Sequence, residues 1–224
     1  DRLGVVYTPG EIVRFMIESA DWLCEHHFGR NLIDRDVEIL DPAVGTGTFI
    51  TELIEHFRGQ PAKLKHKYTE ELHANEVGIL PYYVANLNIE ATYAAITGEY
   101  EEFPGLCLVD TLDNVAGLGK KTGDQIADLF GMGDENVERI KRQNKRKISV
   151  IIGNPPYVRQ ELIADALMAE YRDFYLTDSA RAEIYIPFIE RSLSHLTKGG
   201  NLGFICADRW MKNRYGGPLR HMVA

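Results

Sequence analysis

Hydrophobic residues in this chain alternate between short continuous runs and longer stretches with a helical repeat. The runs predict buried strands, and the repeats predict amphipathic helices. Strands are predicted at Val37–Leu40, Leu72–Val77, Leu106–Val109, Ile148–Ile152 and Leu202–Ala207. Helices are predicted at Glu11–Phe28, Phe49–Phe57, Leu80–Ile96 and Ile184–Leu196. Because strands and helices alternate, we expect an α/β fold with a doubly wound, mostly parallel sheet and helices on both faces.

One stretch between the third and fourth predicted strands breaks this alternation. Residues 112–147 are rich in glycine and charge. A parallel crossover needs only about a dozen residues, so this stretch is predicted to be a charged insertion. It ends in six basic residues, namely Arg139, Lys141, Arg142, Lys145, Arg146 and Lys147. These residues fit phosphate contacts and a solvated charged loop equally well. Farther along, Lys198-Gly199-Gly200 predicts a turn into the last strand.

Composition narrows the class of protein. The chain has 224 residues, of which 45% are hydrophobic and 26% are charged, so it is globular and not disordered. A net charge of −8 argues against a chain that clamps nucleic acid along its whole surface. No apolar run approaches the roughly 20 residues of a membrane span, and we expect a cytoplasmic protein without a membrane partner. Three distant cysteines and scattered histidines predict reduced thiols and no metal site.

Candidate chemistry begins at the end of the first predicted strand. There Asp41-Pro42-Ala43-Val44-Gly45-Thr46-Gly47-Thr48 leads into a helix. Glycines in such a turn let the backbone approach a ligand closely, at the edge where α/β sheets bind ligands. No Gly-Lys-Ser/Thr follows, so the loop is not a phosphate-binding P-loop. An acid at the strand end repels phosphate and attracts a cation.

The next two strands also end in acids. Glu76 follows the second strand, where a carboxylate can accept hydrogen bonds from ribose hydroxyls. Asp110 follows the third strand, in a place to accept from an exocyclic adenine amine. Each acid alone is typical of a turn or a helix cap. Three in succession predict a binding site for a nucleoside without phosphates.

The most informative run is Val150 to Tyr157. An apolar strand runs directly into Asn154-Pro155-Pro156-Tyr157. The two prolines cannot extend a sheet, so they form a rigid turn. That turn presents the Asn154 amide, the Pro155 carbonyl and the Tyr157 ring at the edge of the sheet.

These motifs together resemble those of S-adenosylmethionine-dependent N6-adenine DNA methyltransferases. Gly4-Val5-Val6-Tyr7-Thr8-Pro9 resembles the N-terminal cofactor motif of the family, and its place before the glycine loop is the gamma arrangement. The run from Asn154 to Glu161 is similar to the version in type IIG and type ISP restriction-modification enzymes. Residues 183–190 followed by Lys198-Gly199-Gly200 resemble the next segment of the family. The resemblance implies a Rossmann-like class I methyltransferase fold over nearly the whole chain except 112–147.

The resemblance also implies roles for individual residues. Catalysis would fall to Asn154, Pro155, Pro156 and Tyr157, with the Asn154 oxygen and the Pro155 carbonyl accepting the hydrogens of the target amine. Tyr157 would stack on an adenine flipped out of duplex DNA. S-adenosylmethionine would be bound by residues shared among these motifs, namely Tyr7, Thr8, Pro9, Asp41, Ala43, Gly45, Gly47, Thr48, Glu76, Asp110 and Asn154. No metal is implied, because the methyl group of the cofactor is itself electrophilic.

Domain organisation and two rival functions stay open at this stage. Since the chain begins at Asp1 and ends at Ala224 after an apparent helix start, we expect residues 1–224 to be a methyltransferase catalytic domain from a longer restriction-modification enzyme. The closing strands and target-recognition domain would lie beyond it. Asn-Pro-Pro-Tyr also occurs in protein-glutamine methyltransferases, which is one rival. The other is a non-catalytic, cofactor-binding subunit that positions DNA.

Overall fold

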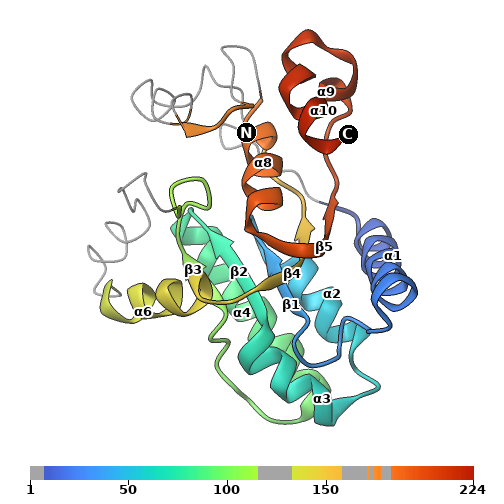
Figure 1. Ribbon diagram of the computed structural model, residues 1–224. Coiled ribbons are helices and arrows are strands. Elements are labelled where there is room, and N and C mark those ends of the chain that lie inside the picture. Colours follow the sequence, from blue (N-terminus) through green and yellow to red (C-terminus); the bar gives the residue numbers. More distant parts are fainter. Residues whose placement is uncertain (1–7, 116–132, 158–170, 172–173, 178–182) are drawn as a thin grey trace.

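A five-stranded parallel sheet forms the centre of the computed structural model, which describes residues 8–115, 133–157, 171, 174–177 and 183–224. Its strands are β1 (Glu38–Asp41), β2 (Leu72–Glu76), β3 (Leu106–Leu108), β4 (Ile148–Gly153) and β5 (Leu196–Phe204). They are ordered β3-β2-β1-β4-β5, and every neighbouring pair is parallel (Figure 1). The chain therefore winds outward in two directions from β1 and β4, which confirms the predicted doubly wound α/β fold.

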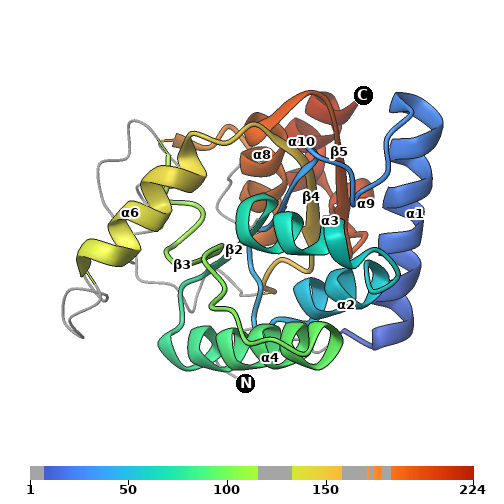
Figure 2. The same ribbon diagram turned by 90° about the horizontal axis from the view of Figure 1, so that it is seen from below.

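Helices cover both faces of this sheet. The longer ones are α1 (Gly10–Phe28), α2 (Thr48–His56), α4 (Ile79–Thr97), α6 (Gly133–Asn144) and α8 (Tyr185–His195). Helices α1, α2 and α4 lie on one side, whereas α6 and α8 lie on the other (Figure 2). The shorter elements are α3 (Pro61–His66), the π-helix η1 (Lys67–Glu71), α9 (Arg209–Lys212), the 3₁₀ turn η3 (Arg214–Gly216) and α10 (Gly217–Val223).

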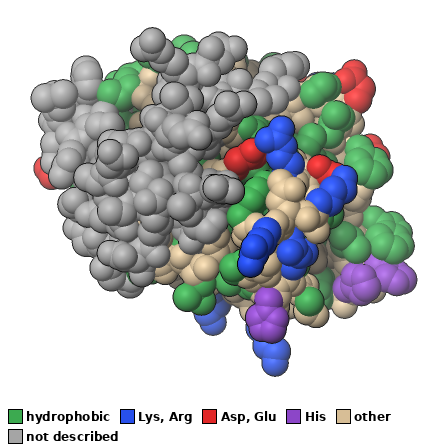
Figure 3. All heavy atoms as spheres, turned by 90° about the horizontal axis from the view of Figure 1, so that it is seen from above, with side chains coloured by type: hydrophobic (Ala, Val, Ile, Leu, Met, Phe, Trp, Pro, Cys, Tyr) green, Lys and Arg blue, Asp and Glu red, His purple; other side chains and the backbone are tan. Residues whose placement is uncertain are grey.

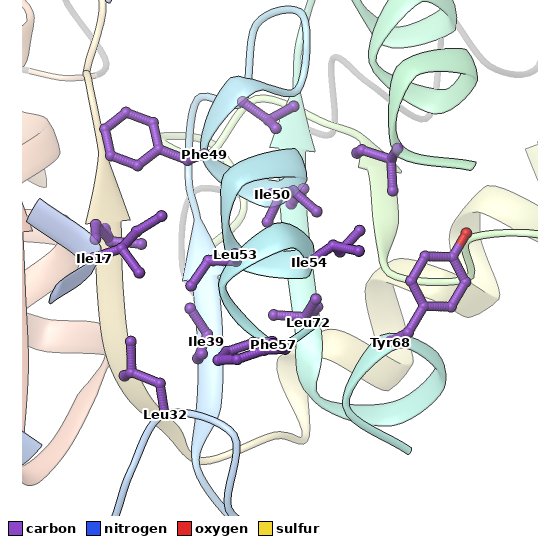
Figure 4. Packing of buried hydrophobic residues seen from close by; sticks show 14 of the residues in the cluster. Ile17, Leu32, Ile39, Phe49, Ile50, Leu53, Ile54, Phe57, Tyr68 and Leu72 are labelled. Atoms are coloured by element: carbon purple, nitrogen blue, oxygen red, sulfur yellow. The ribbon is translucent and has the colours of Figure 1, made fainter. Parts of the chain in front are cut away.

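The main core lies between the sheet and the first helical layer. Ile50, Leu53 and Ile54 of α2, and Phe57 directly after it, point toward the strands, and each is at most 2% exposed (Figure 4). Ile39 of β1 lies beneath them and is fully buried. Burying a side chain of this size contributes about 1.5–3 kcal/mol, so this layer holds the carboxyl end of β1 firmly in place.

Two expectations from the sequence were wrong in detail. The stretch 112–147 is not only an insertion, because α6 lies within it and forms part of the crossover from β3 to β4. The Asn136 side chain of α6 donates to the carbonyl of Leu108 at 2.9 Å and accepts from the Leu108 amide at 2.8 Å. A polar residue therefore fastens α6 to β3.

The turn expected at Lys198-Gly199-Gly200 is also wrong, because it lies inside β5. Pairing moves from Ile148 with Leu196 to Val150 with Asn201, so extra residues of β5 form a bulge. Gly199 has a φ of 84°, which a residue with a side chain rarely adopts. The predicted strand therefore begins earlier than Leu202, and it ends at Phe204.

Candidate functional site

The glycine loop between β1 and α2 wraps around the carboxyl end of the sheet. Gly45 and Gly47 have φ angles of 58° and 96°, so the loop needs residues without a Cβ. A Cβ on Gly47 would lie 3.3 Å from the Ala85 carbonyl, whereas a Cβ on Gly45 would meet open space. The Val44 amide also donates to the Asn75 carbonyl at 2.9 Å. The loop is thus anchored to β2 and leaves room beside Gly45.

Glu76 lies at the end of β2 and holds two backbone amides. Its carboxylate accepts from the Gly45 amide at 3.0 Å and from the Gly78 amide at 2.7 Å. Burial raises the pKa of Glu76 despite these bonds, and repulsion from Asp110 adds to the rise. The side chain is therefore a partly buried acid that is tied to the glycine loop.

Asp110 lies two residues beyond β3. Its carboxylate accepts from the Leu112 amide at 2.9 Å and from the Tyr171 hydroxyl at 2.8 Å. Burial raises the pKa of Asp110 as well. Tyr171 is fully buried, so this contact ties the end of β3 to the chain that follows the Asn-Pro-Pro-Tyr turn.

A cavity of about 190 Å³ lies over these strand ends. Of the residues singled out in the sequence, Ala43, Gly45, Glu76, Asp110, Asn154, Pro155 and Pro156 line it. Its other walls are Pro42, Asn75, Val77, Gly78, Pro81, Val109, Thr111 and Phe188. None of these described lining residues is Lys, Arg or His. The cavity thus joins two acids with an apolar wall, which suits a cationic or neutral nucleoside and disfavours a phosphate.

Asn154 directly follows β4, at the point where strand order reverses between β1 and β4. That reversal is where open α/β sheets bind their ligands. The Asn154 amide nitrogen donates to the Thr8 hydroxyl at 2.9 Å. Thr8 is 6% exposed and comes just before Pro9, the residue that precedes α1. A buried hydroxyl from the start of the chain therefore holds the side chain of Asn154.

Tyr157 is fixed at the far end of the proline turn. Its hydroxyl donates to the Ile205 carbonyl at 2.9 Å, and its ring centroid lies 5.9 Å from that of Tyr185. Burial raises the pKa of Tyr157 to about 12, so the hydroxyl stays protonated at neutral pH. The ring is thus held in place from two sides, next to Pro156, which lines the cavity, although Tyr157 itself does not line it.

Asp41 lies beneath the cavity wall instead of in it. The side chain is fully buried, and Oδ1 accepts from the Ala43 amide at 3.1 Å. Oδ2 has no hydrogen-bond partner among the described residues. Burial raises the pKa of Asp41 to about 7, with a further contribution from Glu76. A Cβ at Gly153 would lie 2.7 Å from Oδ1, so glycine there leaves room for the carboxyl group.

Other predicted site residues lie outside the cavity. Thr48 lines a separate surface groove between α2 and α4, and Gly47 packs against α4. Thr8 is joined to the site by its hydrogen bond with Asn154 and does not line the cavity, and Tyr7 lies outside the described residues. Sequence reasoning missed Pro81, Thr111, Tyr171 and Phe188. Only Phe188 had a signal, because it lies in the segment that resembles the methyltransferase family.

Fold and site together define the class of protein. A Listeria monocytogenes protein described as a class I S-adenosylmethionine-dependent methyltransferase has the same fold. It is 18% identical, has a TM-score of 0.55, and the match covers 96% of this chain and 49% of that one. At this identity the likeness concerns the fold alone, and it confirms the class I methyltransferase architecture.

The chain belongs to the Eco57I restriction-modification methylase family, whose model matches residues 51–224. The type II methyltransferase M.PaeR7I of Pseudomonas aeruginosa is 36% identical over 99% of this chain and 34% of its own length. The structure of DrdV with DNA is 45% identical with a TM-score of 0.83, covering 99% of this chain and 22% of that one. The structure of the type ISP enzyme LlaBIII bound to DNA is 31% identical with a TM-score of 0.79, covering 97% of this chain and 16% of that one.

These matches confirm the family that the sequence motifs resembled. This chain spans about a third of the length of M.PaeR7I and less of the two enzymes with structures. Among the described residues, no helix is both long and apolar enough to cross a bilayer.

Proposed function

We propose that this chain binds S-adenosylmethionine in the cavity and transfers its methyl group to the N6 amine of an adenine in DNA, as the modification part of a restriction-modification system. The observation that carries the proposal is the position of Asn154, Pro155 and Pro156 in the wall of a cavity that also contains Glu76 and Asp110. The named relatives, which are type II methyltransferases and DNA-bound restriction-modification enzymes, support it.

The residues present fit S-adenosylmethionine. The cavity offers acids to a cationic molecule with ribose hydroxyls and an exocyclic amine, and it offers Val77, Val109 and Phe188 to an adenine ring. Gly45 leaves the space that a close ligand needs. We assign Glu76 to the ribose and Asp110 to the adenine amine. Asp41 acts from below, by holding the turn at Ala43.

The bound cofactor would supply an electrophilic methyl group on a sulfonium centre. The chain has to orient a weak nucleophile, because the lone pair of the N6 amine is delocalised into the adenine ring. Asn154 and the Pro155 carbonyl accept the two amine hydrogens, which favours a tetrahedral nitrogen and aims its lone pair at the methyl group. As the N–C bond forms, the bond between the methyl carbon and sulfur would break with its electrons left on sulfur, and the nitrogen would lose one of its protons to solvent. Positioning therefore replaces a strong base.

Two contacts prepare this turn for its role. The Thr8 hydroxyl oxygen accepts a hydrogen bond from the Asn154 amide nitrogen, so the amide oxygen of Asn154 is directed away from Thr8. The Tyr157 hydroxyl bond to Ile205 holds an aromatic ring on which a flipped base can stack. Extruding the base costs a few kcal/mol, whereas stacking returns about 1–3 kcal/mol.

Single-turnover methyl transfer from labelled S-adenosylmethionine tests the proposal on duplex DNA and, in parallel, on protein. We expect transfer to DNA. Asn154→Ala should lower the rate roughly a hundredfold or more, as for a lost oxyanion-type contact, with a much smaller change in cofactor affinity. Calorimetry measures that affinity, and Asn144→Ala on α6 is the matched control. Transfer to protein glutamine instead of DNA, or an Asn154→Ala variant of normal rate, would contradict the proposal.

A further inference from the structure

The segment after β5 is basic, although the chain as a whole is acidic. Residues 208–224 contain Arg209, Lys212, Arg214 and Arg220 but only one acid, Asp208. Several Lys and Arg side chains gather on the face of the molecule that is seen from above, the side on which α9 and α10 lie (Figure 3). This local excess of positive charge differs from the net charge of −8 of the whole chain.

Three of these cations are directed to solvent, whereas the fourth is used within the fold. Arg209, Lys212 and Arg214 are exposed. Arg220 donates to the Asn213 and Trp210 carbonyls and so holds the turn between α9 and α10. We call the exposed set Arg209, Lys212 and Arg214 the α9 cation patch.

Neighbouring acids do not neutralise the positive charge of the α9 cation patch. Arg209 pairs with Glu183 through one nitrogen at 2.9 Å, and its side chain is 62% exposed. A guanidinium has five N–H donors, so others remain for a second anion. Lys212 pairs with Asp208 one helical turn away, and its side chain is 74% exposed. Exposed pairs of this kind contribute only about 0–1 kcal/mol, and a phosphate can replace them.

The α9 cation patch is fastened to the Asn-Pro-Pro-Tyr turn. Tyr157 bonds to Ile205, only three residues before Asp208. Trp210 and Tyr215 pack in the same apolar cluster as Tyr157 and Tyr185. The patch therefore stands on the aromatic cluster that holds Tyr157.

Two arginines of the other basic stretch, Arg139 to Lys147, are engaged elsewhere. Arg139 pairs with Glu102 and Glu135, and Arg146 pairs with Glu38 at 3.2 Å and with Glu70 at 2.8 Å. These arginines belong to internal networks around β3 and the amino end of β1. Their positive charge is largely used within the protein, which argues against a phosphate role for these two arginines.

We propose that the α9 cation patch binds backbone phosphates of duplex DNA beside the extruded base. The inference rests on the proposed function and names the part of the DNA that this surface contacts. Binding there would hold the duplex against the cavity mouth without reading sequence, because phosphate contacts position DNA and base contacts specify it.

The test is the salt dependence of binding to a short duplex, measured by fluorescence anisotropy. The patch variant carries Arg209→Gln, Lys212→Gln and Arg214→Gln. The matched control carries Lys141→Gln, Lys145→Gln and Lys147→Gln, which removes the same charge from exposed positions near α6. The slope of log K against log salt is negative, and each lost phosphate contact makes it less steep by about 0.9. We expect the magnitude of the slope to fall by about two to three in the patch variant and by less than about one in the control.

Equal losses in both variants, no loss in the patch variant, or no salt-sensitive binding by the unaltered chain would overturn the inference. Circular dichroism checks that both variants fold. Calorimetric binding of S-adenosylmethionine separates this inference from the proposed function. If the unaltered chain binds no cofactor while only the patch variant loses DNA affinity, the proposed function fails and the DNA surface stands. If the unaltered chain binds the cofactor while the patch variant keeps its full DNA affinity, the DNA surface fails and the proposed function stands.

Discussion

The two ends of the sheet treat buried acids in opposite ways. At the amino end, each acid is paired with a cation. Lys67 lies 2.5 Å from Glu71, and the Glu38 carboxylate lies 2.6 Å from His73 and 3.2 Å from Arg146. Lys67 is fully buried and also donates to two backbone carbonyls. This end is built for stability.

At the carboxyl end, the acids have no cation. Asp41, Glu76 and Asp110 form no ion pair within the described parts of the chain, and their bonds come from backbone amides and the Tyr171 hydroxyl. Burial raises the pKa of all three. A buried acid without a cation lowers stability at neutral pH. The carboxyl end therefore holds buried acids whose charge a cationic ligand can neutralise, a feature typical of functional sites.

The largest effect that this comparison predicts is at the amino end. Lys67→Met should lower the free energy of unfolding by about 3–5 kcal/mol, because it leaves the Glu71 carboxylate buried without its main cation. Urea unfolding measures the loss. Lys63→Met is the matched control, since Lys63 pairs with Asp34 and is 51% exposed; we expect a change within about 1 kcal/mol. Similar losses in both variants would show that the buried pair is not special.

At the carboxyl end, stability is expected to fall as the pH rises, which is opposite to the effect of an acid that is paired with a cation. Asp41 has a pKa of about 7 in the folded chain, against an ordinary value of 3.8. The folded state therefore keeps a proton that the unfolded state releases, and stability falls as the pH rises through this window. The fall is at most about 1.4 kcal/mol per pH unit. Asp41→Asn cannot titrate, so its stability relative to the unaltered chain should rise between about pH 4 and pH 7.

Urea unfolding at a series of pH values measures this difference. Asp34→Asn is the control with the opposite sign, because Lys63 lowers the pKa of Asp34. The Asp34 contribution is present above the unfolded pKa and is lost as the pH falls through the folded pKa. Parallel pH profiles for Asp41→Asn and the unaltered chain would contradict the raised pKa of Asp41.

A smaller effect concerns ligand affinity. Glu76→Gln should weaken S-adenosylmethionine binding roughly tenfold to a hundredfold, since hydrogen bonds to charged groups contribute about 1.5–3 kcal/mol. Glu70→Gln at the amino end is the matched control and should leave the affinity unchanged. Calorimetry compares the two. An unchanged affinity in Glu76→Gln would mean that the acids of the carboxyl end do not serve this cofactor.

Asp41 and Asp110 could be predicted because each comes directly after a short apolar run, whereas Glu76 ends a weaker strand that also contains His73 and Asn75. Parallel strands then bring their carboxyl ends to one edge, so Glu76, Asp110 and Asn154 had to meet. Helix α6 could not be predicted as easily, because Ile140 is its one fully buried large apolar residue and Asn136 makes its main contact with β3. The contact between Thr8 and Asn154 joins residues 146 positions apart. Only the packing of α1 against the sheet brings them together.

The smallest predicted effect concerns a neutral hydrogen bond at the carboxyl end, the one between Thr8 and Asn154, and its contribution to the rate of methyl transfer. Thr8 is a positioning residue, because it acts through Asn154. Thr8→Val keeps the shape but removes the hydroxyl, so it should lower the rate of methyl transfer roughly two- to tenfold, the worth of one net hydrogen bond of about 0.5–1.5 kcal/mol. Thr8→Ser restores the hydroxyl and should restore most of the rate. Cofactor affinity should change little in either variant, which separates this role from the direct cofactor contact that the motif resemblance implies. A Thr8→Val variant that loses cofactor affinity while keeping its single-turnover rate would assign Thr8 to the cofactor and not to Asn154.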